Sequence, residues 1–273
     1  MNEEIKRLLI MKEDGFNISM VWDALKRRVA YIPHIICFFW PFGFYRKNRQ
    51  KIKKYKNIHK GKRCFVIANG PSLKKIDFNL LKDEYTIGMN RIYLMKEING
   101  FVPNYLMCCD EKTQLLQFTD EYDNLDLPCF YNFKLRNRFS KKTNQQFFAS
   151  RFKIKFVKDF STLAGNGGSV CFNALELAYY MGFEEVYLIG KDHSYNTTEK
   201  YKVLSNTGEE QNHFSEKYYK PGQIWGTPDY FKEEMAYRKA RLAYEKNGRI
   251  IKDATIDGKL DVFEKVNFLS LFE

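Results

Sequence analysis

Proline and cysteine are scarce in this sequence, and their spacing matches neither a proline-rich repeat nor a cysteine-based metal site. Only seven of the 273 residues are proline, and no segment is repeated or low in complexity, which excludes collagen-like, repeat and disordered proteins. The six cysteines form no CxxC pair, and four lie inside apolar runs where a reduced thiol packs as a small hydrophobic side chain. We therefore expect a reducing compartment and no structural zinc.

Acidic residues are sparse only at the start of the chain. Residues 1–63 hold sixteen Lys or Arg against five Asp or Glu, so they account for an excess of eleven within the total charge of +12. The remaining chain is nearly neutral, whereas a nucleic-acid-binding protein carries its basic residues over the binding domain. We expect no nucleic-acid partner.

The N-terminal segment also lacks the order of a signal peptide, because acidic and basic residues alternate through residues 1–14. We therefore expect a cytoplasmic protein. Sixteen uncharged, aromatic-rich residues follow at 29–44, with basic clusters on both sides. The stretch is shorter than the roughly 20 residues of a membrane-spanning helix, and Pro33 and Pro41 interrupt it.

Trp and Phe flanked by cations are typical of a segment that lies in the interface of an anionic membrane leaflet. The alternative is a hydrophobic arm packed on the domain. We define residues 1–60 as an N-terminal helical or aromatic arm and residues 61–273 as the domain. Peripheral attachment at the inner face of the cell membrane is the expectation for the arm.

From residue 61 onward, short apolar runs alternate with helical periodicity, which predicts a mostly parallel α/β sheet. One amphipathic helix is predicted at 169–181, with Gly182 as its stop. A second begins with Thr227 as cap and Pro228 in its first turn, and runs through Lys246. The predicted strands are 63–68, 85–89, 105–109, 129–132, 155–157, 186–189 and 249–251.

Ligands of open α/β sheets bind at the carboxyl ends of the strands, and polar residues or glycines follow the predicted strands here. A second glycine-rich turn opens the helix at 169–181, where free backbone amides form an anion site. We expect a nucleotide site, with substrate-binding candidates Asn69, Gly70, Pro71, Ser72, Asn90, Arg91, Asp110, Gly167, Gly168, Ser169, Gly190 and Asp192. For Asp110 and Asp192 the alternative is simple loop capping, a common use of Asp after strands.

Several of these segments together resemble a known family. The run VIANGPSLKKIDF is followed by MNRIY, and later GGS opens a helix that leads into GFEEVYLIGKDHSY. This order resembles the bacterial lipooligosaccharide sialyltransferases and their broader kin, the motility accessory flagellin glycosyltransferases and the MptE-like pterin diphosphokinases. The resemblance covers most of residues 63–270 and implies a Rossmann-like sheet with helices on both faces, a glycosyltransferase A-type variant.

In the sialyltransferase branch, the resemblance assigns the nucleotide site to Asn69, Gly70, Pro71 and Ser72, with Ala68 in place of the family's first glycine. Asn90, Gly168 and Ser169 match the next two motifs. The family's pair of phosphate-binding tyrosines matches Tyr195 and Tyr201, and its general base matches His213.

These residue types suit transfer from a nucleotide-activated sugar, which needs a base for the acceptor hydroxyl and donors for the departing phosphate. The chain has no Asp-x-Asp pair, the usual metal-holding element of many glycosyltransferases, so we expect a reaction without metal or other cofactor. As an alternative, His213 is only a solvated histidine in a loop, and His193 is the base or a residue that supports the site. The spacing of Tyr195 and Tyr201 could also arise by chance. The aromatic residues Tyr218, Tyr219, Trp225 and Tyr230 are expected to form a lid over the acceptor.

The first functional hypothesis is a bacterial glycosyltransferase of polysaccharide biosynthesis, with a CMP-activated acidic sugar as donor and a glycan or glycolipid as acceptor. The second is a pterin-type diphosphokinase that uses ATP and Mg²⁺, for which Asp110 and Asp192 could hold the metal. A non-enzymatic nucleotide sensor or membrane-bound scaffold is the third. Self-association into a homo-oligomer stays open.

Overall fold

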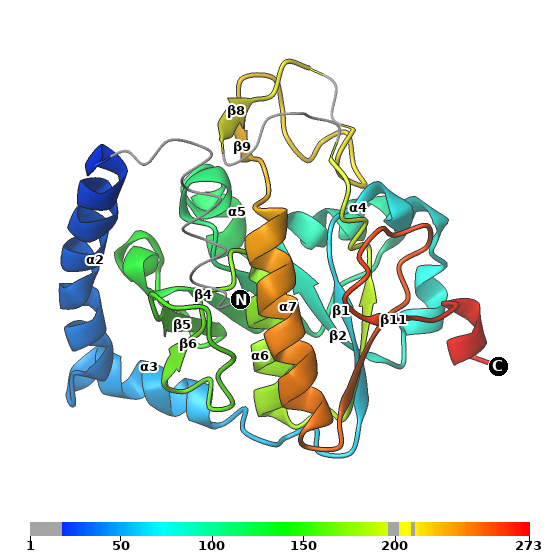
Figure 1. The fold of residues 1–273 in the computed structure, drawn as a ribbon, viewed down its shortest axis with the longest axis horizontal. Coiled ribbons are helices and arrows are strands. Elements are labelled where there is room, and N and C mark those ends of the chain that lie inside the picture. Colours follow the sequence, from blue (N-terminus) through cyan, green and yellow to red (C-terminus); the bar gives the residue numbers. More distant parts are fainter. Residues whose placement is uncertain (1–17, 196–201, 209–210) are drawn as a thin grey trace.

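A nine-stranded parallel sheet forms the centre of the computed structural model, which describes residues 18–195, 202–208 and 211–273. Every neighbouring pair in the sheet is parallel, in the order β11-β10-β7-β1-β2-β3-β4-β5-β6. The strands are β1 (Arg63–Ile67), β2 (Tyr85–Met89), β3 (Tyr105–Cys108), β4 (Cys129–Asn132), β5 (Gln145–Ser150), β6 (Leu163–Ala164), β7 (Glu185–Ile189), β10 (Ile250–Asp253) and β11 (Glu264–Lys265). A separate antiparallel pair, β8 (Val203–Ser205) and β9 (Ile224–Gly226), lies at the top of Figure 1.

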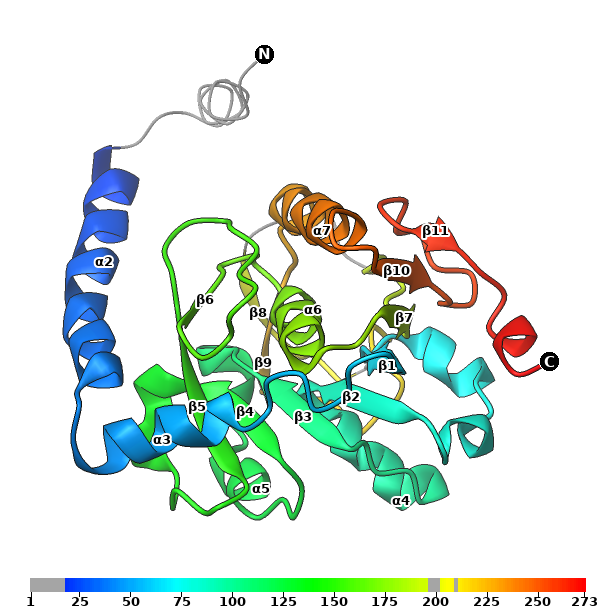
Figure 2. The same ribbon diagram turned by 90° about the horizontal axis from the view of Figure 1, so that it is seen from below.

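Helices cover both faces of this sheet, which confirms the predicted α/β class. In Figure 2, α6 (Val170–Met181) and α7 (Tyr230–Glu245) lie on one side, and α4 (Met95–Asn99) and α5 (Thr119–Asp123) lie on the other. Short helical turns connect the strands: η1 (Pro71–Lys75), η2 (Phe78–Leu81), η3 (Asn90–Leu94), η4 (Glu111–Leu115), η5 (Phe133–Arg138) and η6 (Leu269–Leu271). The chain reverses direction across the sheet between β1 and β7, which are adjacent strands. Such a switch point is where open α/β sheets bind their ligands.

The strand predicted at 155–157 is wrong. The backbone N–H of Val157 donates to the buried carboxylate of Glu176 at 2.8 Å, so a side chain takes the place of a neighbouring strand there. The sheet is instead extended by β5 and β6. Periodicity missed β5 because it begins with Gln145 and Gln146, which look exposed in the sequence but are only 1% and 2% exposed.

The two predicted helices are present, with one corrected start. Ser169 caps α6 by accepting a hydrogen bond from Cys171 N at 3.2 Å, and Gly182 ends it in the left-handed conformation with φ 94°. The second helix, α7, is capped by Asp229, which accepts from Lys232 N at 2.8 Å, and not by Thr227 as predicted. The Thr227 hydroxyl instead accepts a hydrogen bond from the backbone N–H of Lys202 at 2.8 Å.

The described part of the arm packs on the edge of the domain through one face. It forms α2 (Ile18–Phe39) and α3 (Gly43–Lys53), which lie beside β5. Phe38 and Ile52 are fully buried, and the Asn48 amide exchanges hydrogen bonds with the Phe147 backbone at 2.7 and 2.8 Å. Residues 31–53 therefore contribute to the core, and cutting at residue 60 would remove part of it.

Among the helices of the described residues, none combines the length and apolarity needed to cross a membrane.

Candidate functional site

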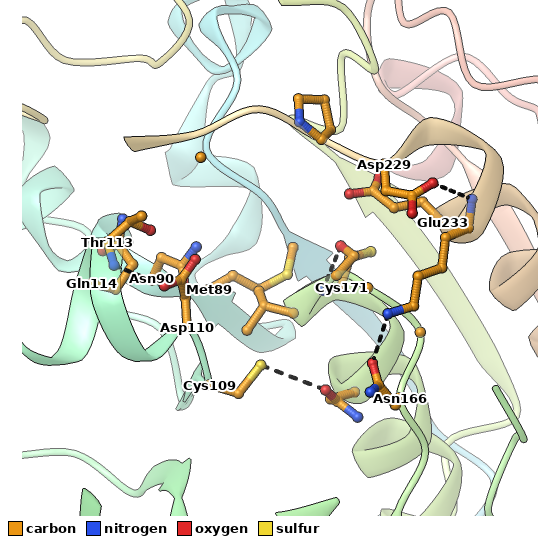
Figure 3. A pocket seen from close by; sticks show the side chains of 18 of the residues that line it. Met89, Asn90, Cys109, Asp110, Thr113, Gln114, Asn166, Cys171, Asp229 and Glu233 are labelled. Atoms are coloured by element: carbon orange, nitrogen blue, oxygen red, sulfur yellow. Dashed lines mark hydrogen bonds between the residues drawn. The ribbon is translucent and has the colours of Figure 1, made fainter. Parts of the chain in front are cut away.

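A pocket of about 1360 Å³ opens at the carboxyl ends of the central strands. Its lining includes eleven of the predicted site residues: Asn69, Gly70, Asn90, Asp110, Gly167, Gly168, Ser169, Gly190, Asp192, Tyr195 and His213. Figure 3 shows Asn90 and Asp110 on one wall and Asn166, Asp229 and Glu233 on the facing wall. The structure thus brings together residues that lie up to 144 positions apart in the sequence.

The loop after β1 is fastened directly to the loop after β7. Gly70 N donates to Gly190 O at 2.9 Å. The two carboxylate oxygens of Asp192 accept from Ser72 N at 3.0 Å and from Ser72 Oγ at 2.7 Å. A Cβ on Gly70 would lie 1.8 Å from Asp192 Oδ2, so only glycine allows this approach. Asp192 therefore caps the first loop, and it also lines the pocket.

Two amide oxygens at this end of the pocket lack partners. Asn69 Oδ1 and Asn90 Oδ1 are buried, and neither has a hydrogen bond among the residues that the structure describes. The Asn69 amide nitrogen is held by Met89 O at 3.0 Å, and Asn90 has a left-handed backbone with φ 47°. An unsatisfied buried acceptor costs about 1–3 kcal/mol, and strained non-glycine backbone collects at ligand sites. Both residues line the pocket, and the described residues leave these two oxygens without a hydrogen-bond donor.

The glycine-rich turn before α6 is anchored by a buried carboxylate. Glu176 accepts from Gly165 N at 2.9 Å, from Val157 N at 2.8 Å and from Asn173 Nδ2 at 3.0 Å. Burial raises its pKa to about 8 from an ordinary 4.5, although these three donors oppose the shift. The turn places Gly168, with φ 78°, and Ser169 at the first free amides of α6.

We expect Glu176→Gln to remove a specific pH dependence of stability. Because the folded-state pKa is raised, the folded protein holds a proton that the unfolded chain releases. This contribution is fully present below pH 4.5 and is lost as pH rises through about 8. Urea unfolding at pH 5 and pH 8 should show that the wild-type free energy of unfolding falls by about 2–4 kcal/mol more than that of the variant. Equal slopes in the two proteins would contradict this assignment.

A buried charged cluster forms the wall opposite Asn90. Lys191 Nζ contacts Glu233 Oε2 at 2.8 Å, and the two side chains are 11% and 7% exposed. His193 lies next to them with φ 54°, its Nε2 is 3.2 Å from Glu234 Oε1, and burial and then Lys191 lower its pKa. Its Nδ1 is buried without a hydrogen bond in the described part of the chain. Lys191 and Glu233 neutralise each other, and His193 lines the pocket beside them.

His213 is surrounded by aromatic side chains, an aromatic cage, next to the loop that follows β1. Its ring stacks flat on Tyr218, with centroids 3.8 Å apart and planes at 5°, and meets Tyr219 edge-on at 5.4 Å. Tyr195 lies 6.1 Å away and stacks on Trp225 at 5.9 Å. The next residue, Phe214, donates its N–H to Asn69 O at 2.9 Å, so the histidine is fixed beside the predicted nucleotide loop. His213 is 8% exposed, and therefore is not a solvated loop residue.

Arg91 supports this cage from outside the pocket. Its guanidinium donates to the carbonyls of Tyr218 and Lys217 and pairs with Glu121 at 2.8 Å, and it lies 3.8 Å from the centre of the Phe118 ring. Arg91 is 4% exposed and does not line the pocket. The structure therefore places it as an anchor of the 213–219 segment.

Two other predicted site residues, Pro71 and Ser72, are also not among the residues that line the pocket. Pro71 and Ser72 lie behind it in η1, where Ser72 binds Asp192. Tyr201 lies outside the described residues. Asp110 lines the pocket and also caps η4, accepting from Thr113 N at 2.9 Å.

The sequence analysis missed the contributions of Lys191, Glu233 and α2 to the pocket lining. Lys191 is the second residue after the predicted strand 186–189, so the strand-end rule already pointed to it. Glu233 lies within a predicted helix, and only the docking of α7 brings it to Lys191. Arg27, Arg28, Ala30 and Tyr31 of α2 line the pocket from the arm, and no local signal marks that contact.

Comparison with known proteins matches this chain to a family and to solved structures that include a sialyltransferase. Residues 43–198 match the family described as 6-hydroxymethylpterin diphosphokinase MptE-like. The sialyltransferase CstII from Campylobacter jejuni, solved with the substrate analogue cytidine-5'-monophosphate, is 15% identical, with a TM-score of 0.41. That match covers 74% of this chain and 84% of the CstII chain. No curated protein sequence matches.

Proposed function

The chain belongs to the MptE-like family. From the geometry of its site we propose that it is a glycosyltransferase of bacterial polysaccharide biosynthesis. It transfers a CMP-activated acidic sugar, such as a sialic acid, to a glycan or lipid-linked acceptor. The observation that carries this proposal is the position of His213, fixed by the Phe214–Asn69 hydrogen bond of 2.9 Å beside two unpartnered amide oxygens. A base next to a donor site is the arrangement that glycosyl transfer needs.

In this proposal each group has one task. Asn69 and Asn90 hold the nucleotide, and the free amides of α6 at Gly168 and Ser169 bind the phosphate. His213 removes the proton from the acceptor hydroxyl as the bond from the sugar to the phosphate breaks, and the departing nucleotide takes the negative charge. Tyr195 and Tyr201 donate hydrogen bonds to that phosphate, so protein donors take the place of a metal. The enzyme acts as a peripheral protein at the inner face of the membrane.

The family name favours a second candidate, a diphosphokinase that transfers pyrophosphate from ATP to a pterin alcohol. That chemistry relies on magnesium held by carboxylates. The two candidate carboxylates carry structural hydrogen bonds: Asp192 with both oxygens to Ser72, and Asp110 with one oxygen to Thr113 N. Asp110 keeps one oxygen for a metal, so ligand binding has to separate the two candidates.

Isothermal titration with CMP, UDP, GDP and ATP, each with and without Mg²⁺, tests the proposal together with Asn69→Ala. We expect CMP to bind without Mg²⁺. The alanine variant should bind CMP about 5- to 150-fold more weakly, because loss of one buried hydrogen-bonding amide costs about 1–3 kcal/mol. Asn79→Ala is the matched control, since Asn79 is exposed and lies outside the pocket.

Binding of ATP with Mg²⁺ and not of CMP would replace the transferase by the diphosphokinase. CMP binding unchanged by Asn69→Ala would remove the loop after β1 from the donor site.

A further inference from the structure

The outer face of α2 carries a continuous apolar stripe. Seven side chains at helical spacing of three and four residues are each between 44% and 57% exposed: Val21, Trp22, Leu25, Val29, Ile32, Ile36 and Phe39. At the corner between α2 and α3, Trp40 and Phe42 are 50% and 68% exposed. Figure 1 shows α2 along one edge of the molecule, with no described element on its outer side.

The opposite face of the same helix is already occupied by the domain. Tyr31 OH accepts from Ser150 N at 3.0 Å, His34 Nδ1 is 3.1 Å from the Arg136 guanidinium, and the Phe38 ring meets Phe133 at 5.2 Å. These contacts fix the rotation of α2, so the stripe cannot turn inward without breaking them. Soluble monomers rarely expose an apolar surface of this extent unless it binds something.

The charges around the stripe identify an anionic partner. With 3.6 residues per turn, Lys26 and Arg28 project on its two sides, where long basic side chains reach lipid headgroups. Asp23 is the single acidic residue of α2, and α3 has none while exposing Arg46, Lys47 and Lys53. An interfacial helix has this combination of an apolar face and flanking cations.

A second copy of the chain fits these charges less well. The stripe also has the three-and-four spacing of a coiled-coil seam, but the flanking positions of such a seam hold charges that pair across the interface. Here the two charged residues beside the stripe, Lys26 and Arg28, have the same sign and so offer no opposite charges to pair across a seam. The observations therefore favour a bilayer over a dimer.

The inner side of α2 connects this face to the active-site pocket. Arg27, Arg28, Ala30 and Tyr31 line the pocket together with Arg151 and Lys153 from the segment after β5. A bilayer lying on the stripe would therefore be only one helix diameter from the pocket, about 10–12 Å. The basic side chains at this end of the pocket suit a phosphate-bearing acceptor.

We propose that α2 binds an anionic membrane through its apolar stripe and presents the pocket to a membrane-borne, phosphate-bearing acceptor, an inference that rests on the proposed transferase function. The partner is a lipid surface rich in anionic headgroups. The helix lies in the headgroup region parallel to the membrane, with Lys26 among the lipid phosphates and Arg28 at the border between the membrane and the pocket. The nucleotide loops stay on the side that faces the cytoplasm.

Co-sedimentation of the full chain with phosphatidylglycerol-containing vesicles tests this proposal. We expect the wild type to sediment with these vesicles and to bind pure phosphatidylcholine vesicles about tenfold or more weakly, since each basic residue near an anionic surface adds to binding. The triple variant Trp22→Gln, Val29→Gln, Ile36→Gln should bind phosphatidylglycerol vesicles at least about tenfold more weakly, because it removes half-exposed apolar groups from the stripe.

The matched control is Ile58→Gln, Ile98→Gln, Leu269→Gln, at side chains 47%, 56% and 57% exposed elsewhere on the surface. It should sediment as the wild type does. CMP titration of both triple variants should give the wild-type affinity, which shows that they are folded.

Equal vesicle binding by the two triple variants, or no binding by the wild type, would overturn the membrane proposal. The same holds for a stripe-dependent dimer in sedimentation equilibrium without vesicle binding. Vesicle binding without any CMP binding would instead support the membrane proposal and contradict the proposed CMP-sugar donor.

Discussion

Replacing His213 with alanine is expected to lower kcat by about 10² to 10⁴, the usual contribution of a positioned general base, while CMP affinity changes little. The imidazole is held between Tyr218 and Tyr195 and next to the Asn69 loop, so its removal affects proton transfer more than donor binding. Single-turnover transfer and CMP titration measure the two quantities separately.

His193→Ala is the matched control for this prediction. His193 also lines the pocket, and burial lowers its pKa, so it is neutral at pH 7 and could serve as a base on electrostatic grounds alone. It lies with the Lys191–Glu233 pair, whereas His213 lies beside Asn69. If His193→Ala abolished turnover and His213→Ala did not, the base would be His193, and the family assignment of His213 would be wrong.

Gly70→Ala is expected to weaken CMP binding by at least about 100-fold and to lower the free energy of unfolding by about 3 kcal/mol. The new Cβ would lie 1.8 Å from Asp192 Oδ2 and 2.8 Å from Gly190 O, so the carboxylate would have to leave Ser72. Each hydrogen bond to a charged group contributes about 1.5–3 kcal/mol. The loop after β1 would then lose the position from which it contacts the nucleotide.

Gly226→Ala provides the comparison for that variant, because its new Cβ would meet only Thr113 Cγ2 at an ordinary 3.8 Å. CMP titration and thermal unfolding of both proteins check the prediction. Wild-type affinity in a folded Gly70→Ala protein would show that the Asp192 contact does not position the donor loop.

The hydrophobic pattern of neighbouring residues correctly predicted those helices and strands that depend only on local sequence. The strands at 85–89 and 129–132 match β2 and β4, and the helix stop at Gly182 has the expected left-handed backbone. Each depends on the hydrophobicity or backbone freedom of neighbouring residues. The strand predicted at 155–157 failed because the Val157 backbone binds Glu176, a partner 19 residues away. No window around Val157 contains that information.

The candidate site likewise combines residues that local sequence predicts with roles that only long-range packing sets. The strand-end rule found Asn69, Asn90 and Asp192, because parallel strands end at a common edge of the sheet. It did not separate residues that line the pocket from residues that support it. Arg91 follows β2 as directly as Asn90 does, yet its guanidinium turns away to hold the carbonyl of Tyr218, 127 residues later.

Four features could be predicted from the amino-acid sequence alone: the α/β class, the order of most strands along the chain, the glycine-bearing loops and the concentration of positive charge in residues 1–63. These are properties of composition and short-range periodicity. Only the tertiary structure decided that Asp192 fastens Ser72, that His213 lies beside Asn69, and that α2 buries Phe38 while exposing Trp22. The physical reason is that a residue's role depends on which distant groups surround its side chain, and long-range packing sets those neighbours.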